Sequence, residues 1–213
     1  MEKQTFSWEL FNKMPLIGII RNLSIEDIKY AMEVFAEAGF TNVEVTLNTK
    51  NATEAIAYMA QQYAGKINIG AGTVCTLNDL DMAVDAGAQF IVSPIIKKEV
   101  IVKSVAMGIP IFPGAFTPTE IYEAWELGAP MVKVYPAGSL GPDYIASVLS
   151  PLNAIKLLPT GGVHLNNAKA FMKAGASGLG VGGELFNKKI IASRDKNNLL
   201  AHFDLFKKEM ENI

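Results

Sequence analysis

The charged side chain that most needs a chemical explanation is Lys133, which lies in the apolar stretch MVKVYP (131–136). Side chains of a strand alternate between its two faces, so Lys133 points away from Val132 and Val134. The valines suit packing against helices, which leaves the lysine facing the interior. Burial disfavours the ammonium form, so the pKa falls and the neutral amine can attack a carbonyl. We therefore predict a catalytic, nucleophilic lysine at position 133.

Glu44 has an equivalent inward position between two valines of NVEVTL (42–47). A carboxylate near a neutral amine can transfer protons, which makes Glu44 the second catalytic candidate. The alternative is a buried structural ion pair between Lys133 and Glu44, although such pairs seldom offset the free-energy cost of their desolvation. Lys156 is a rival amine, but it lies near the start of its strand, the end of a barrel associated with stability.

Further candidates follow other apolar runs. Arg21 ends LIGIIR (16–21) and is suited to bind an anionic substrate group; the alternative is a surface salt bridge. PTGG (159–162) and GVGG (180–183) are glycine-rich strand ends, where backbone amides often bind phosphate in barrels; the alternative is that they serve tight turns. Thr73 offers a hydroxyl and an amide at the same rim, and Tyr135 is expected to form a pocket wall.

These residues must be positioned by a repeating unit, because short apolar runs alternate with amphipathic stretches almost throughout the chain. The runs are LIGIIR (16–21), NVEVTL (42–47), INIGAG (67–72), FIVSP (90–94), PIFPGA (110–115), MVKVYP (131–136), IKLLPTGG (155–162) and GLGVGG (178–183). Eight such units predict an α/β fold: a single (β/α)8 TIM barrel, with its chemistry at the carboxyl ends of the strands. A short helix at about 5–13 precedes it and a last helix spans about 191–211. An open doubly wound sheet is the alternative, but no GxGxxG follows the first run.

Local signals mark the helix boundaries. Thr76 with Asp79, and Thr117 with Glu120, have capping-box spacing at helix starts, and so has Ser24 with Asp27. Glycines that precede strands are expected at helix ends. They are Gly39, Gly65, Gly87, Gly108, Gly128 and Gly175.

Composition limits the remaining possibilities. The 213 residues (1–213) fit one domain, and the net charge of −2 without a basic block argues against nucleic-acid binding. No apolar run is long enough for a membrane span, and the N-terminus does not resemble a signal peptide. The single cysteine, Cys75, favours a cytoplasmic location, and two separated histidines make a metal site improbable. We expect a small-molecule substrate, no cofactor and no metal.

The order and spacing of seven motifs resemble the 2-keto-3-deoxy-6-phosphogluconate/4-hydroxy-2-oxoglutarate (KDPG/KHG) aldolase family over nearly the whole chain. The motifs are EVTL (44–47), GAGTV (70–74), FIVSP (90–94), PGAFTPTE (113–120), VKVYPA (132–137), PTGGV (159–163) and GVGG (180–183). The resemblance implies a (β/α)8 barrel, usually a homotrimer.

The resemblance also implies roles for single residues. Lys133 is the Schiff-base lysine and Glu44 the proton acceptor and donor. The candidate substrate-binding residues are Arg21, Thr73, Pro94, Thr160, Gly161, Gly162, Gly182 and Gly183. Thr73 is expected at the pyruvate carboxylate, and the threonine and glycines from 160 onward at the far end of the substrate.

The chain departs from the gluconate-type pattern at two positions. Asn48 stands where that pattern has a substrate-binding arginine, whereas the galactonate-type branch has asparagine there and an arginine at the position of Arg21. Glu184 follows GVGG, where a small hydroxyl residue is common, and its carboxylate repels a phosphate unless it turns away. Without a ligand, a carboxylate at this helix start is favourable in itself.

The predicted function is therefore a carbon–carbon lyase of the Schiff-base type. Its substrate is a 2-keto-3-deoxy-6-phospho sugar acid or 4-hydroxy-2-oxoglutarate, cleaved to pyruvate and an aldehyde. Two alternatives are a phosphate-binding barrel isomerase or synthase without a covalent intermediate, and a sugar-acid-binding barrel without catalysis.

Overall fold

The computed structural model describes residues 4–211, in which parallel strands alternate with helices. The strands are β1 (Leu16–Ile20), β2 (Asn42–Thr46), β3 (Asn68–Gly72), β4 (Phe90–Val92), β5 (Ile111–Phe112), β6 (Gly114–Ala115), β7 (Val132–Val134), β8 (Leu157–Pro159) and β9 (Leu179–Val181). The helices are α1 (Trp8–Lys13), α2 (Ile25–Glu37), α3 (Ala52–Gln62), α4 (Leu77–Asp85), α5 (Lys98–Ala106), α6 (Pro118–Glu126), α7 (Pro142–Leu149), α8 (Leu165–Lys173), α9 (Lys188–Ala192) and α10 (Lys196–Glu211), with a 3-10 turn at Ala137–Ser139.

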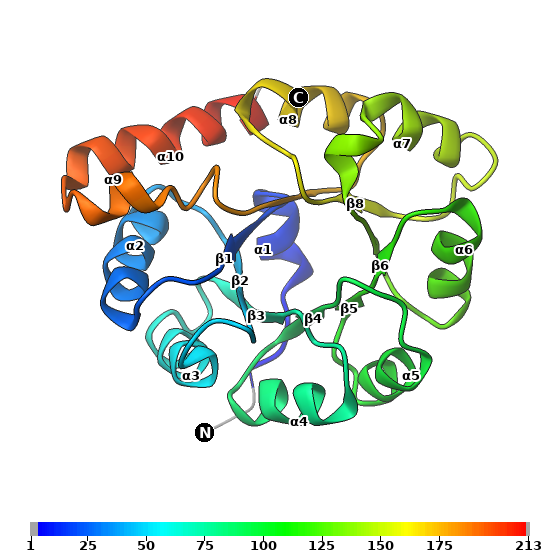
Figure 1. Ribbon diagram of the computed structural model, residues 1–213, viewed down its shortest axis with the longest axis horizontal. Helices are drawn as coiled ribbons and strands as arrows, with labels where there is room; N and C mark the ends of the chain where they lie inside the picture. The colour runs from blue at the N-terminus through cyan, green and yellow to red at the C-terminus, as the bar shows by residue number, and fades with distance from the viewer. Residues whose placement is uncertain (1–3, 212–213) are drawn as a thin grey trace.

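The strands form two parallel sheets. One has six strands in the order β5-β4-β3-β2-β1-β9, and the other has three in the order β6-β7-β8. Figure 1 shows the strands around a common centre, with α2 to α10 outside them and α1 across the middle. The structure confirms the predicted α/β architecture with parallel strands. The strands form two separate sheets, however, and not the one continuous eight-stranded barrel that was predicted.

The predicted strand at 110–115 is interrupted. β5 and β6 flank Pro113, which has no amide hydrogen to donate to a neighbouring strand. The chain changes partner at this point, because β5 pairs with β4 whereas β6 pairs with β7. An isolated bridge between Thr160 and Gly180 links the ends of β8 and β9.

Local signals fixed most helix boundaries. Thr76 and Thr117 form complete capping boxes with Asp79 and Glu120, as predicted. Ser24 accepts a hydrogen bond from the amide of Asp27, which caps α2 without a complete box. All six glycines predicted at helix ends have positive φ.

Two terminal helices differ from the prediction. The expected helix at 5–13 begins only at Trp8, where Ser7 caps it. The expected single helix at 191–211 is two helices, α9 and α10, because Arg194 between them has a left-handed backbone with φ of 57°. None of the helices in residues 4–211 is long and apolar enough to cross a membrane.

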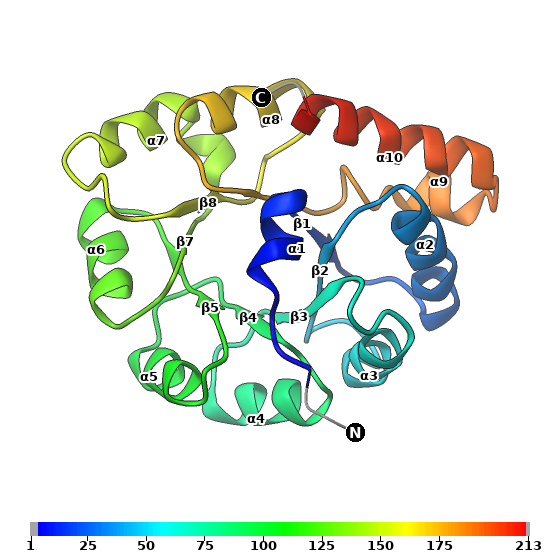
Figure 2. The same cartoon turned by 180° about the vertical axis from the view of Figure 1, so that it is seen from behind.

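The core has two layers, inside and outside the strands. Outward side chains such as Val43, Val45, Val132 and Val134 belong to the large cluster that includes the helices. A smaller cluster of Phe11, Ile17, Phe90, Val92, Phe112, Met131 and Leu158 fills the interior. Figure 2 shows α1, which supplies Phe11, across this end of the strands. Apolar packing, together with the hydrogen-bonded amides of Asn42 and Asn68, therefore closes the amino ends of the strands, and Glu44 and Lys133 lie farther along their strands.

Candidate active site

Lys133 lies on the inward side of β7, as the two-residue period predicts. Its strand neighbours Val132 and Val134 pack outward with the helices, while Met131 belongs to the interior cluster. The side chain is 4% exposed, and Nζ lies 4.8 Å from the centre of the Tyr135 ring. The sequence therefore places this amine in a nearly dry interior.

Two causes lower the pKa of Lys133. Burial is the larger, and the positive charge of Arg21 adds to it, while Glu44 acts in the opposite direction. Since the ammonium form is disfavoured, the amine is more available as a nucleophile than an exposed lysine. Lys156, the rival amine, is exposed, and its Nζ lies 5.5 Å from the centre of the Trp8 ring, on the side that α1 covers.

Glu44 on β2 is the matching acid, with 1% exposure. Burial raises the pKa of its carboxyl to about 7, against the opposing attraction of Lys133 and Arg21. Such a pKa suits a group that both accepts and donates protons near neutrality. Its Oε2 is buried and has no hydrogen-bond partner among residues 4–211.

The geometry does not favour the alternative of a structural ion pair. No salt bridge within 4.0 Å joins Lys133 to Glu44 in the described part of the chain. Each nevertheless changes the pKa of the other through its charge. The two groups thus lie close enough to interact electrostatically and remain free to act on a third group.

Gly72, at the end of β3, packs directly against the carboxyl group of Glu44. A Cβ atom at Gly72 would lie 2.7 Å from the carboxyl carbon of Glu44, so only glycine leaves room for this side chain. The next residue, Thr73, has a left-handed backbone with φ of 60°. This conformation is rare for a β-branched residue and costs about 1–3 kcal/mol, a strain that is typical of functional sites.

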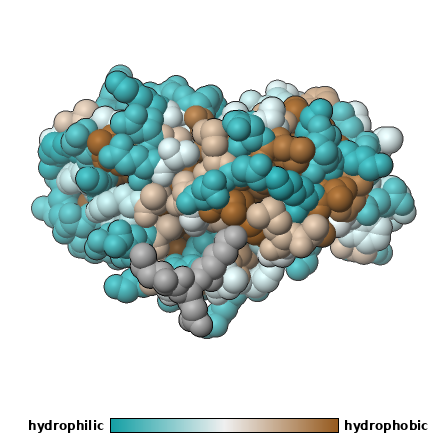
Figure 3. Space-filling model, turned by 90° about the horizontal axis from the view of Figure 1, so that it is seen from below, coloured by the Kyte–Doolittle hydropathy of each residue, from teal (hydrophilic) through white to brown (hydrophobic). Residues whose placement is uncertain are grey.

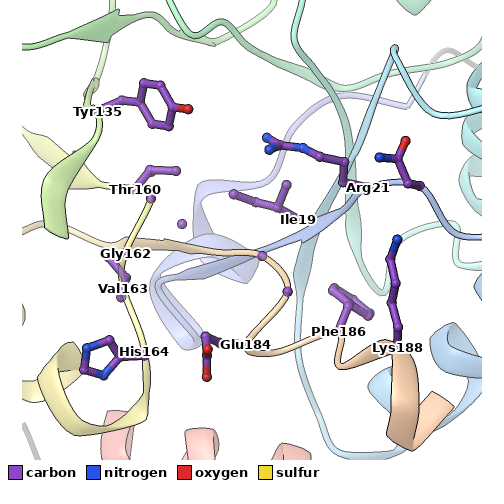
Figure 4. A pocket seen from close by; sticks show the side chains of 15 residues that line it. Ile19, Arg21, Tyr135, Thr160, Gly162, Val163, His164, Glu184, Phe186 and Lys188 are labelled. Atoms are coloured by element: carbon purple, nitrogen blue, oxygen red, sulfur yellow. The ribbon is translucent and has the colours of Figure 1, made fainter.

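A cavity of about 510 Å³ is lined by Arg21 and Tyr135. Lys133 and Glu44 do not line it, but Tyr135 contacts Lys133 and the charge of Arg21 acts on both groups. Six of the predicted substrate-binding residues line it: Arg21, Thr160, Gly161, Gly162, Gly182 and Gly183. Figure 4 shows the Arg21 side chain pointing toward the space between Ile19 and Tyr135. The interpretation of Arg21 as a surface salt bridge is not favoured, because none of the ion pairs within 4.0 Å in residues 4–211 includes it.

The glycine-rich ends have conformations that other residues rarely adopt. Gly161 and Gly162 have φ of 80° and 79°. A Cβ atom at Gly161 would lie 2.9 Å from Cε2 of Tyr135, and one at Gly180 would collide with Thr160. These contacts account for glycine at both positions without a ligand, so tight packing and anion binding are both possible uses of these segments.

Not every predicted residue shares the cavity. Pro94 lines a separate hollow of about 350 Å³ with Phe116, and Tyr135 borders both spaces. Thr73 borders neither of them. Asn48 is exposed and also borders neither. The arginine side chain at the larger cavity is therefore that of Arg21, which directly follows β1.

Several lining residues were not predicted to contact substrate. They are Ile19, Asn22, Val163, His164, Phe186 and Lys188. Ile19 lies two residues before Arg21 and therefore on the same face of the chain, so the two-residue period of a strand could have predicted it. Lys188 follows GVGG by five residues in a short helix, where nothing in the sequence marks it. No group of three or more His, Cys, Asp or Glu side chains suited to a metal ion occurs within residues 4–211.

The chain is similar to known proteins over most of its length. The family model of KDPG and KHG aldolases matches residues 9–201. The 2-dehydro-3-deoxy-6-phosphogalactonate aldolase of Escherichia coli K12 is 35% identical over 82% of this chain and 85% of its own length.

Solved structures are similar over almost the whole chain. The one described as "Native KDPGal structure" is 30% identical, with a TM-score of 0.88 over 98% of both chains. A KDPG aldolase from Legionella pneumophila, described with pyruvate captured as a covalent carbinolamine intermediate, is 26% identical, with a TM-score of 0.83 over 94% of this chain and 96% of that one.

Proposed function

The chain belongs to the family of KDPG and KHG aldolases, and we propose that it is a class I aldolase that cleaves a 2-keto-3-deoxy-6-phospho sugar acid to pyruvate and an aldehyde. The observation that carries the proposal is the pairing of a buried amine of lowered pKa, Lys133, with a buried carboxyl of raised pKa, Glu44. The lowered pKa favours the nucleophilic amine of Lys133, and a pKa near neutrality lets Glu44 both accept and donate a proton.

The reaction begins at Lys133. Its neutral amine adds to the C2 ketone of the substrate, forming a carbinolamine, and loss of water gives an imine. In its protonated form the imine accepts the electron pair of the C3–C4 bond when that bond breaks. The products of this step are an aldehyde and an enamine still attached to Lys133.

Glu44 performs the proton transfers. As a carboxylate it takes the proton of the C4 hydroxyl, directly or through water, while the C3–C4 bond breaks. The resulting carboxylic acid then returns a proton to C3 of the enamine. Water adds to the imine, releases pyruvate and restores the free amine.

We assign the roles of Thr73 and Pro94 from the family resemblance, and those of the residues that line the cavity from their places in it. Thr73 binds the pyruvate carboxylate, and Pro94 borders that end of the substrate. Arg21 contacts the sugar-acid chain, while Thr160, Gly161, Gly162, Gly182 and Gly183 bind its far end. The presence of Arg21 in the cavity and of Asn48 outside it favours a galactonate-type over a gluconate-type substrate. With 4-hydroxy-2-oxoglutarate as substrate, the same residues perform the same steps.

The fold proposed with this function is a single barrel domain over residues 1–213, of which 4–211 are described. β5 and β6 count as one strand interrupted at Pro113, and the Thr160–Gly180 bridge joins the remaining edges. A cytoplasmic location stays a prediction that rests on the single cysteine, Cys75.

A homotrimer, as the family resemblance implies, is supported by an apolar surface on α4, α5 and α6 and their adjoining loops. Nine of the ten exposed large hydrophobic residues within 4–211 lie there: Leu77, Met82, Ile95, Val102, Val105, Met107, Phe116, Tyr122 and Trp125. In Figure 3, brown side chains gather on the side of the molecule that carries α4 and α5. Such a concentration is typical of a protein–protein interface.

The test is covalent trapping. Incubation with pyruvate and borohydride should attach one reduced pyruvate per chain, and peptide mass spectrometry should find it on Lys133. Lys133→Arg should fold and lack both the adduct and activity, because a guanidinium stays charged and cannot form the imine. Lys156→Arg is the matched control and should keep both. An adduct on Lys156, or turnover without any adduct, would contradict the mechanism and favour an enzyme without a covalent intermediate.

A further inference from the structure

We propose that Lys188 is a substrate-binding residue for the phosphate at the distal end of the substrate, a role that rests on the proposed aldolase function. Lys188 lines the cavity of about 510 Å³ together with both glycine-rich strand ends. It determines specificity for a phosphate monoester over an unphosphorylated sugar acid by supplying a positive charge at the rim.

The distal end of the cavity needs such a charge. A phosphate monoester carries about −1.5 to −2 charges near neutrality. The amides of Gly162 and Gly183 can donate hydrogen bonds, but they carry no net charge. Glu184, which also lines the cavity, adds a negative one. Amides alone therefore leave this end electrostatically unfavourable for a dianion.

Among the residues that line the cavity, the lysine and arginine side chains are those of Lys188 and Arg21. Neither forms an ion pair within 4.0 Å in the described part of the chain, whereas nearby cations do: Arg194 binds Asp27 and Lys196 binds Glu37. Their charges are thus available to a ligand.

The two cations have different positions along the cavity. Arg21 follows β1 and acts on the pKa values of both Lys133 and Glu44, which places it near the reacting carbons. Lys188 begins α9, is exposed, and is not among the charges that affect either catalytic group. This separation assigns Lys188 to the outer, distal end.

The side-chain directions agree with this assignment. Figure 4 shows Lys188 extending from α9 toward the segment that carries Arg21. In the same view the Glu184 carboxylate turns away from the space between Arg21 and Thr160. Lys188 thus extends along the wall of the cavity, while the carboxylate of Glu184, which also lines it, points away from the space between Arg21 and Thr160.

The backbone of Lys188 is well anchored. Phe186 is 2% exposed and stacks on Phe35, with ring centres 5.3 Å apart. The side chain of Asn187 accepts hydrogen bonds from the amides of Lys189 and Ile190, which fixes the start of α9. The base of the Lys188 side chain is therefore held in place beside the cavity, and only its flexible end must order on binding.

The experiment compares Lys188→Gln with Lys189→Gln. Lys189 is the adjacent exposed lysine of the same helix and does not line the cavity, so it controls for general surface charge. Calorimetry measures binding of glycerol 3-phosphate and of glycerol at low salt. Condensation assays with pyruvate measure kcat/KM for glyceraldehyde 3-phosphate and for glyceraldehyde.

We expect Lys188→Gln to weaken glycerol 3-phosphate binding about tenfold, a change of about 1.4 kcal/mol. The same variant should lower kcat/KM about tenfold for the phosphorylated aldehyde and leave that for glyceraldehyde within about twofold. Lys189→Gln should stay within about twofold throughout. An equal loss for both aldehydes, an equal loss in Lys189→Gln, or no loss would overturn the role of Lys188.

The binding arm separates this inference from the proposed function. If the wild type forms no pyruvate adduct and no carbon–carbon bond, the aldolase proposal fails. Binding of glycerol 3-phosphate that still depends on Lys188 would then uphold the distal anion site alone. A wild type that does not bind glycerol 3-phosphate would overturn the inference, whatever its turnover.

Discussion

Replacing Glu44 by glutamine should stabilise the protein, and more strongly at high pH. Burial raises the pKa of this carboxyl from its ordinary value of 4.5 to about 7 in the folded state. The folded protein therefore holds a proton that the unfolded chain has released between these two pH values. Since the folded state binds more protons there, the free energy of unfolding must fall as pH rises from about 4.5 to about 7.

The size of the effect follows from the two pKa values. At about 1.4 kcal/mol per pH unit of difference, ionised Glu44 costs about 3 kcal/mol of stability at pH 8. At pH 5 the folded state keeps the proton while the unfolded chain has lost only part of it, so the cost is about 1 kcal/mol. Glutamine has nearly the same shape and no charge to desolvate. The stability gained by Glu44→Gln should therefore be about 2 kcal/mol larger at pH 8 than at pH 5.

The measurement is urea unfolding of the wild type and Glu44→Gln at four pH values from 5 to 8. Because Lys133 interacts with Glu44, the comparison is repeated in a Lys133→Met background. Without the ammonium group, which lowers the pKa of Glu44, the pH-dependent gain should grow. A gain that is the same at pH 5 and pH 8 in both backgrounds would refute the raised pKa and the role of desolvation.

The remaining predictions concern catalysis, strain and assembly. Because Glu44 must be ionised to accept the C4 hydroxyl proton, kcat/KM for cleavage should decline as pH falls below about 7. Glu44→Gln should slow deuterium exchange into the pyruvate methyl group about 10²–10⁴-fold, and unaffected exchange would exclude it as the proton carrier. Thr73→Gly should raise the free energy of unfolding by about 1 kcal/mol, because the relief of left-handed strain exceeds the conformational entropy that glycine loses on folding. The same variant should raise KM. A variant less stable than the wild type would argue against strain at Thr73. Trp125→Lys should dissociate the proposed trimer to chains of 23.0 kDa in light scattering, whereas Leu205→Lys, outside the α4–α6 surface, should not. A trimer that survives Trp125→Lys would contradict an interface on this surface.

The direction of the Lys133 and Glu44 side chains was predictable because it depends only on local alternation. Val132 and Val134 must bury one face of their strand, so Lys133 must occupy the other, and the same holds for Glu44 between its valines. Capping boxes at Thr76 and Thr117 are equally local, which is why those helix starts matched the prediction.

Distances across the ring of strands depend on tertiary structure. Alternation puts Arg21, Glu44 and Lys133 inside, but only the packing of the strands determines that Arg21 changes the pKa of both Glu44 and Lys133 without forming an ion pair with Glu44 within 4.0 Å. The same packing separates Pro94 into its own hollow and leaves the left-handed backbone of Thr73 beside Glu44.

The position of Lys188 at the cavity could not be predicted from sequence patterns. A short helix after a glycine-rich turn has too few residues for a periodic signal, and a lysine there is ordinarily solvated. Its place at the cavity depends on the anchoring of Phe186 against Phe35, a residue of α2 far away in the sequence. Because this contact joins residues far apart in the sequence, only the tertiary structure determines that Lys188 lies at the cavity.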